Sequence, residues 1–286
     1  MNKLIQFLSV AATFVVFAAG GYLLACCTSN NNDSSNEPSS KSLILYYSQT
    51  GATQQVAELL KNKVNADIES IQLVNPYDGD FQQTIARCQQ EMASGNTPEL
   101  KPLTSDIAAY DTIYVGYPVW FGTYAMPIAT LIKDEAFEGK VVIPFCTFGS
   151  GGLNTSSDAL AANMPKTAIL PGYGVRNARV SKADAELDLF LVSSGIIKGE
   201  MPQLADFSDQ VAVTDADKAL FDEACSGYQM PLGTPVTVGS RAIAEGTEYL
   251  FTVESQGQDG NKQESKIYVI KPSADGAVAE FTQVVR

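Results

Sequence analysis

The sequence predicts a doubly wound α/β domain with five parallel strands, followed by a small α+β domain with an antiparallel sheet. From residue 41 onward, short apolar runs alternate with amphipathic segments, as in a parallel sheet covered by helices on both faces. After about residue 200, one amphipathic segment is followed only by strand-like runs and Gly-rich turns. With 45% apolar residues, the 286-residue chain can form one large domain or two ordinary ones.

Residues 1–25 read as a targeting segment rather than as part of the fold. Lys3 precedes an apolar run that ends in Leu-Leu-Ala-Cys at residues 23–26. A basic start, an apolar core and a small residue at the cut are typical of a signal peptide. The ending resembles a bacterial lipobox, which implies a lipid on Cys26 and an envelope location, periplasmic or on the outer surface. The alternative is a retained transmembrane anchor, because the run is nearly long enough to span a bilayer.

Residues 26–40 are polar and low in complexity, so we expect a flexible tether. The net charge of −13 argues against nucleic acid or an anionic membrane surface as a partner. The expected contact with the membrane is therefore the covalent lipid on Cys26 alone. Histidine is absent and no C-x-x-C pair exists, which excludes imidazole catalysis and common zinc sites. Cys88, Cys146 and Cys225 form an odd set, so at least one free thiol is expected.

The periodicity of apolar residues places each element in turn. A continuous apolar run at 43–47 predicts the first buried strand, and the helical spacing of apolar residues over 52–64 predicts the helix that follows it. The later strands of the domain at 41–199 are expected at 68–74, 112–116, 141–145 and 168–172, and the later helices at 80–93, 125–134, 156–163 and 182–194, the last capped by Ser181. In the domain at 208–286 we expect a helix over 214–225 and strands over 234–239, 248–255, 265–271 and 278–285.

Ligands of such sheets bind beyond the carboxyl ends of the strands, which directs attention to three loops. The first follows strand one and consists of Ser48, Gln49, Thr50, Gly51, Ala52 and Thr53. It opens a helix, so its backbone N–H groups and hydroxyls suit a phosphate monoester. It lacks the lysine that a triphosphate loop requires. Ordinary helix capping by Ser48 or Thr50 explains the same residues equally well.

The second loop follows strand three and carries Pro118, Val119, Trp120, Phe121 and Gly122. Its aromatic side chains could stack on a flat ligand, or they could cover the end of the sheet or contact a partner. The third loop follows strand four and comprises Thr147, Phe148, Gly149, Ser150, Gly151 and Gly152. Its glycines allow backbone N–H groups to approach a ligand closely, although its spacing is not that of a dinucleotide fingerprint.

Together, the three loops describe a site for a flat phosphorylated heterocycle. The stretch SQTGAT resembles the phosphate loop of flavodoxins, and the series YYSQTGAT, NPYDGDF, YDTIYVGYPVWFGTYAMPI, GKVVIPFCTFGSGG and LPGYGV resembles the bacterial flavodoxin-like family over residues 41–197. The resemblance implies FMN as the cofactor. Ser48 to Thr53 would bind its phosphate, Pro118 to Gly122 would line the isoalloxazine with Trp120 or Phe121 stacking, and Thr147 to Gly152 would bind the pyrimidine edge. Ala52 stands where many relatives have asparagine.

Flavin carries the electron or hydride itself, so no catalytic side chain is expected. The resemblance implies an FMN-dependent oxidoreductase, either an electron carrier or a quinone-type reductase, with a redox partner or a small-molecule acceptor. The absence of lysine and arginine from the three loops disfavours the anionic reduced flavin and predicts a low reduction potential. The alternative function is a surface binding lipoprotein that uses this domain as a scaffold without redox turnover.

The C-terminal domain resembles a cystatin-like module around Ala242 to Tyr249. The inhibitory loop of that family begins with glutamine, and Ala242 occupies this position here. We therefore expect a small binding or oligomerisation domain rather than a protease inhibitor.

Overall fold

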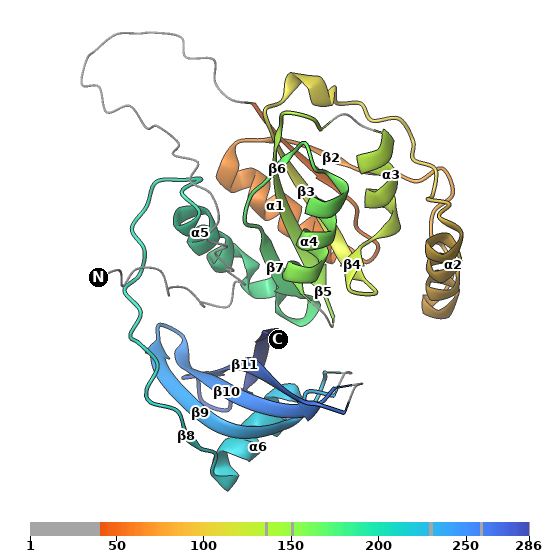
Figure 1. Cartoon of the computed structure of the whole chain (residues 1–286). Coiled ribbons are helices and arrows are strands. Elements are labelled where there is room, and N and C mark those ends of the chain that lie inside the picture. The colour runs from red at the N-terminus through yellow and green to blue at the C-terminus, as the bar shows by residue number, and fades with distance from the viewer. Residues whose placement is uncertain (1–40, 135–136, 150–151, 229–230, 258–259, 286) are drawn as a thin grey trace, which may run out of the picture.

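A computed structural model describes residues 41–134, 137–149, 152–228, 231–257 and 260–285 (Figure 1). The signal peptide and tether expected at residues 1–40, including Cys26, lie outside the described residues. Within the described ranges, no helix has the length and apolar character needed to cross a membrane.

The first sheet has five parallel strand positions in the order β2-β1-β3-β5-β6, with β7 also paired to β5 and β4 to β3. The order changes direction between β1 and β3, and the crevice at this switch point is the expected ligand position in such sheets. The strands are β1 (Ser42–Tyr46), β2 (Asp67–Ser70), β3 (Thr112–Trp120), β4 (Thr123–Tyr124), β5 (Val141–Phe148), β6 (Ala168–Ile169) and β7 (Tyr173–Arg176).

Helices cover both faces of this sheet. Side chains of β1 alternate between the two core clusters, with Ile44 packing toward α1 and α5 and Leu45 toward α3 and α4. This alternation explains why the strands read as continuous apolar runs. The helical elements are α1 (Ala52–Val64), α2 (Phe81–Ser94), the 3₁₀ turn η1 (Ile107–Ala109), α3 (Met126–Asp134), α4 (Leu153–Asn163), the 3₁₀ segment η2 (Asn177–Lys182) and α5 (Ala183–Ser193).

The C-terminal domain is one helix packed on an antiparallel sheet in the order β12-β11-β10-β9-β8. Thr214 and Asp217 form a capping box at the start of the helix, and Phe221 from the helix meets Phe251 of β10 at 5.2 Å between ring centroids. The elements are β8 (Val211–Ala212), α6 (Asp215–Cys225), β9 (Thr234–Ile243), β10 (Gly246–Gln256), β11 (Lys262–Pro272) and β12 (Glu280–Val285).

The fifth strand differs from the expected single run at 168–172. Two short strands, β6 and β7, flank the segment Leu170–Gly172, and each pairs with a different part of β5. At Gly172 the backbone passes so close to β5 that an added Cβ would lie 2.2 Å from the carbonyl oxygen of Pro144. The expected cap at Ser181 is also wrong, because Ser181 lies inside η2 and α5 begins after Lys182 without a side-chain cap.

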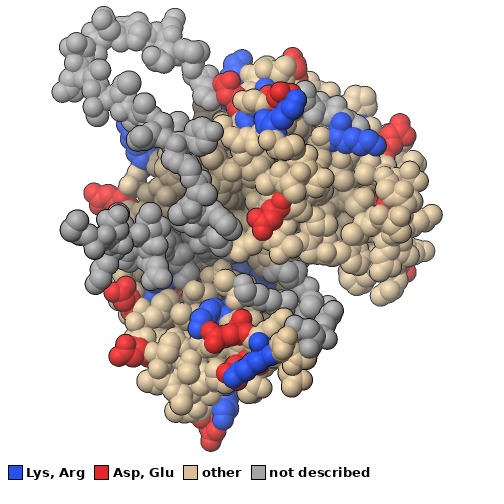
Figure 2. Space-filling model, in the orientation of Figure 1, with Lys and Arg blue, Asp and Glu red and all other residues tan. Residues whose placement is uncertain are grey.

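Charged side chains of both signs are interspersed on the surface. On the face shown in Figure 2, blue and red side chains lie close together over both domains. Exposed pairs such as Lys166–Glu138 at 3.2 Å and Lys271–Glu223 at 2.9 Å illustrate this arrangement. Such exposed pairs contribute little to stability.

The three cysteines within the described residues, Cys88, Cys146 and Cys225, are free thiols. The first two are buried, and burial raises the pKa of Cys88 to about 11. These thiols therefore act as packing groups, as the sequence predicted for a chain that does not depend on disulfides.

Candidate functional site

The first loop joins β1 to α1 at the carboxyl edge of the sheet. Gly51 stands at the start of the helix with φ of 90°, a left-handed conformation that favours glycine. The Ser48 hydroxyl oxygen accepts hydrogen bonds from the backbone N–H groups of Gly51 and Gln54, each at 3.2 Å. Ser48 therefore does act as a helix cap, and the loop is ordered by its own contacts.

Capping leaves other donors at this helix start without an acceptor. No described residue accepts a hydrogen bond from the backbone N–H of Thr50, Ala52 or Thr53. The first turn of α1 contains no acidic residue, and nothing lies within 4 Å of a Cβ added at Gly51. These unused N–H groups, the positive end of the helix dipole and the exposed Thr50 hydroxyl form a donor set that fits a phosphate monoester.

A buried hydroxyl pair brings the first and third loops together. The Thr53 and Thr147 side-chain oxygens lie 2.9 Å apart, and both residues are 1% exposed. Thr147 closes the β5 end of the site, so the expected phosphate loop and the expected pyrimidine loop share one wall. Ala52, next to Thr53, is half-buried and packs against the core that contains Ile44, which accounts for an apolar residue at that position.

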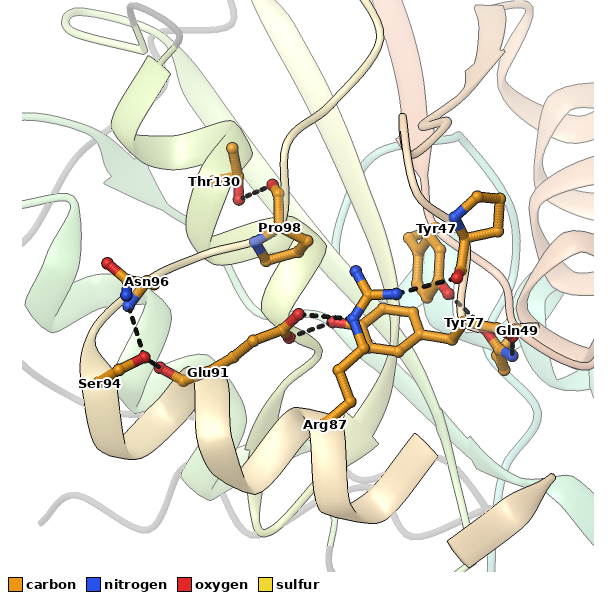
Figure 3. A network of polar contacts seen from close by, with 10 residues as sticks. Tyr47, Gln49, Tyr77, Arg87, Glu91, Ser94, Asn96, Pro98 and Thr130 are labelled. Carbon is orange, nitrogen blue, oxygen red and sulfur yellow. Dashed lines mark hydrogen bonds and ion pairs between the residues drawn. The ribbon is translucent and has the colours of Figure 1, made fainter. Parts of the chain in front are cut away.

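Gln49 points away from the helix start. Its side-chain nitrogen donates to the carbonyl oxygen of Tyr77 at 2.6 Å, and its side-chain oxygen accepts from the Tyr47 hydroxyl. Figure 3 shows Gln49 beside these two tyrosines. The first loop is thereby tied to the segment before α2, and Gln49 is a supporting residue of the loop.

The second loop is a hairpin rather than an irregular loop. Pro118, Val119 and Trp120 belong to β3, and β4 pairs with the last two of them, with Trp120 opposite Thr123. Phe121 and Gly122 form the two-residue turn with φ of 51° and 79°, as a type I′ turn requires. The hairpin extends the third strand beyond its expected end at residue 116.

The aromatic residues of this hairpin have different surroundings. Trp120 is half-buried and meets Tyr47 and Tyr77 edge to face, at 5.9 and 5.2 Å between ring centroids. Phe121 at the tip is 52% exposed. Of the two rings predicted to stack on a ligand, Trp120 is therefore engaged in an aromatic cluster, whereas Phe121 is accessible.

Tyr77 is a site residue that the sequence analysis did not single out. Its hydroxyl donates to Glu91 at 2.5 Å, and the Arg87 guanidinium lies over its ring at 4.1 Å (Figure 3). Arg87 also donates to the Pro76 carbonyl and pairs with Glu91 at 2.8 Å. Burial, followed by the hydrogen bond to Glu91, raises the pKa of Tyr77 above its ordinary value, so its hydroxyl stays protonated. Two residues of α2 thus hold this tyrosine against the first and second loops.

The third loop begins at the end of β5. Thr147 and Phe148 are strand residues, Gly149 is exposed, and Gly152 caps α4 with nothing within 4 Å of an added Cβ. Ser150 and Gly151 lie outside the described residues. Arg176 at the end of β7 pairs with Phe148 in the sheet and donates from Nε to the Gly149 carbonyl oxygen at 3.4 Å. It brings a positive charge to loops that contain none, and the sequence analysis missed it.

The first domain matches a known family and is similar to solved structures. The sequence profile of a family described as Flavodoxin matches residues 41–188. A candidate flavoprotein from Bacteroides uniformis is 31% identical over 52% of this chain and 98% of its own, with a TM-score of 0.47. A flavoprotein from Lactobacillus acidophilus in complex with FMN is 24% identical over 50% of this chain and 97% of its own, with a TM-score of 0.44. The comparison with curated proteins finds no match.

Proposed function

The chain belongs to the flavodoxin family, and from this premise we propose that it binds FMN and serves as an oxidoreductase or electron-transfer protein. The observation that carries the proposal is the start of α1. It offers three backbone N–H groups for which no described residue is an acceptor, has no acid in its first turn, and lies at the switch point of the sheet. This donor set suits the single phosphate of FMN.

The described residues divide the binding of FMN among three loops. Thr50, Gly51 and the first turn of α1 would hold the phosphate. The hairpin would supply the apolar wall for the isoalloxazine, with Phe121 free to stack and Trp120 held in place by Tyr47 and Tyr77. The backbone around Gly149 would face the pyrimidine edge.

The bound flavin supplies electron or hydride transfer, and the chain supplies position, exclusion of water and electrostatics. A protein acid or base is not required, which agrees with a wall built from aromatic and backbone groups. An electron carrier and a quinone-type reductase that acts on small acceptors both remain consistent with this site.

Titration with FMN and with riboflavin, followed by flavin fluorescence, tests the proposal. Riboflavin lacks the phosphate, and a hydrogen bond to a charged group contributes about 1.5–3 kcal/mol. Two such bonds predict that FMN binds at least about 100-fold more tightly than riboflavin. Equal affinities would show that the start of α1 does not hold the phosphate. If neither flavin bound, the function would instead be that of a surface binding protein with this domain as a scaffold.

The proposal includes attachment to the bacterial cell envelope, on its periplasmic or outer side, through a lipid on Cys26. Its support is the Leu-Leu-Ala-Cys ending of the apolar run. We expect labelled fatty acid to be incorporated into the wild-type chain in a bacterial host and into the matched control Cys27→Ser, but not into Cys26→Ser. Label retained by Cys26→Ser, or a mature protein that keeps residues 1–25 by mass spectrometry, would refute the assignment.

A further inference from the structure

Arg176 joins the third loop to the C-terminal domain. On one side, its Nε donates to the Gly149 carbonyl oxygen. On the other side, its Nη1 donates to the carbonyl oxygen of Phe281 in β12 at 3.1 Å. The Cζ atom of the guanidinium also lies 4.5 Å from the centroid of the Phe281 ring and 5.5 Å from that of the Tyr228 ring. One side chain thus bridges two domains at the ligand edge of the first sheet.

The C-terminal domain is held at this edge by further charged contacts. Arg179, three residues beyond Arg176, pairs with Glu280 of β12. Lys182 at the end of η2 lies 3.9 Å from Glu245 in the turn between β9 and β10. Figure 1 shows the C-terminal sheet lying below the edge at which β5 and β7 end. The second domain therefore faces the carboxyl ends of the parallel strands, where the proposed FMN site is found.

The Arg176 guanidinium keeps its charge although it is partly buried. Burial lowers the pKa of the Arg176 guanidinium below its ordinary value, and the like charge of Arg179 also lowers it. Tyr228 and Cys225 of the C-terminal domain act in the opposite direction and raise this pKa. A guanidinium nevertheless remains protonated at neutral pH. Its contacts with Gly149 and Phe281 are to carbonyl oxygens, so these partners do not neutralise the charge.

We propose that Arg176 is a positioning and charge-supplying residue through which the docked C-terminal domain raises the reduction potential of bound FMN. This inference rests on the proposed FMN site. The three loops contain no lysine or arginine, and this composition predicts a low potential. Arg176 changes that expectation because it places a cation beside the loop that would hold the pyrimidine edge, and the C-terminal domain fixes it there.

A cation raises the reduction potential when the protein that carries it binds reduced FMN more tightly than oxidised FMN. Two-electron reduction of FMN, with uptake of one proton, adds one negative charge to the flavin, and a nearby cation stabilises that product more than the oxidised form. A tenfold preference for the reduced form corresponds to about 30 mV for a two-electron couple. We expect the loss of the Arg176 charge to remove a preference of about tenfold.

The test measures the midpoint potential of FMN bound to the full chain, by reductive titration with dithionite against a reference dye. We expect Arg176→Gln to lose about tenfold more affinity for reduced FMN than for oxidised FMN, and so to have a potential lower by about 30 mV. Arg176→Lys keeps the charge and should retain most of the wild-type potential. Lys166→Gln is the matched control, because it removes one exposed positive charge near the amino ends of the strands.

Hydrogen exchange provides a second readout. Arg176→Gln should increase amide exchange in residues 147–149 and in β12, whereas Lys166→Gln should not. An unchanged potential in Arg176→Gln, or an equal shift in Lys166→Gln, would overturn the inference. Unchanged exchange in β12 would overturn the role of the C-terminal domain. If the wild-type chain bound no FMN, the proposed function would fail and this inference with it, a result distinct from FMN binding with an unchanged potential.

Discussion

Thr50→Glu is expected to abolish FMN binding while leaving the protein folded. Thr50 is exposed in the first loop, next to the N–H groups that have no acceptor within the described part of the chain. Two unit negative charges about 5 Å apart repel each other by about 3 kcal/mol at an effective dielectric constant of about 20, which is the scale expected for a carboxylate beside the phosphate. The affinity for FMN should therefore fall at least about 100-fold. The same carboxylate near a helix N-terminus is favourable in the free protein, so unfolding should not become easier.

Thr50→Gln is the matched control, because glutamine has the size of glutamate without its charge. It should retain FMN binding within about tenfold of wild type, since it leaves the backbone donors in place. Fluorescence titration measures both affinities, and circular dichroism confirms the fold. If Thr50→Glu and Thr50→Gln weaken binding equally, size rather than charge is responsible and the phosphate does not lie at this loop.

Arg179→Met should produce the largest loss of stability. The Arg179 and Glu186 side chains are each 5% exposed and form an ion pair at 2.8 Å, and Arg179 also pairs with Glu280. Burial raises the pKa of the Glu186 carboxyl above its ordinary value although Arg179 lies against it. Among the residues that the structure describes, removing the guanidinium leaves that carboxylate with the Tyr173 hydroxyl alone, at 2.7 Å. Breaking a buried pair in this way costs about 3–5 kcal/mol.

Urea unfolding measures this loss, and two further variants identify its cause. Lys166→Met breaks the exposed pair with Glu138 and should cost no more than about 1 kcal/mol. The double variant Arg179→Met with Glu186→Leu removes both charges and should recover a large part of the lost stability. If Arg179→Met destabilised the chain no more than Lys166→Met does, the buried pair would not be the source of stability.

The sequence predicted elements well where burial on one or two faces sets a clear period. The apolar positions of 52–64 repeat at helical spacing, and α1 covers those residues. The helix expected over 214–225 is α6, which begins at Asp215 because Thr214 is its capping residue. The bounds of strands were predicted poorly where pairing with a neighbouring strand sets them. The hairpin pairing that extends β3 to Trp120 and the division of the fifth strand at Gly172 both depend on contacts with residues distant in sequence.

The candidate site shows the same limit. The first loop could be located because a strand, a glycine and a helix start follow one another in the chain. Tyr77 and Arg176 were missed because each reaches the loops from another part of the chain. Tyr77 lies 29 residues after Ser48, and Arg176 lies on β7, the last strand of the first sheet. The local sequence shows a turn of Asn-Pro-Tyr around Tyr77 and an arginine at a strand end for Arg176. Neither pattern predicts which residues the side chain will contact.

The buried pair of Thr53 and Thr147 determines how many hydroxyl protons these two residues can offer. Each threonine carries one proton and can accept at its oxygen, and either residue can be the donor in their shared bond. One proton is used between them, which leaves a single spare proton for the pair. An acceptor that takes this proton from one threonine also sets the direction of the shared bond, and so leaves only lone pairs at the other threonine. The donor and acceptor roles of the two threonines, one in the first loop and one in the third, are thus linked by the orientation of one hydrogen bond.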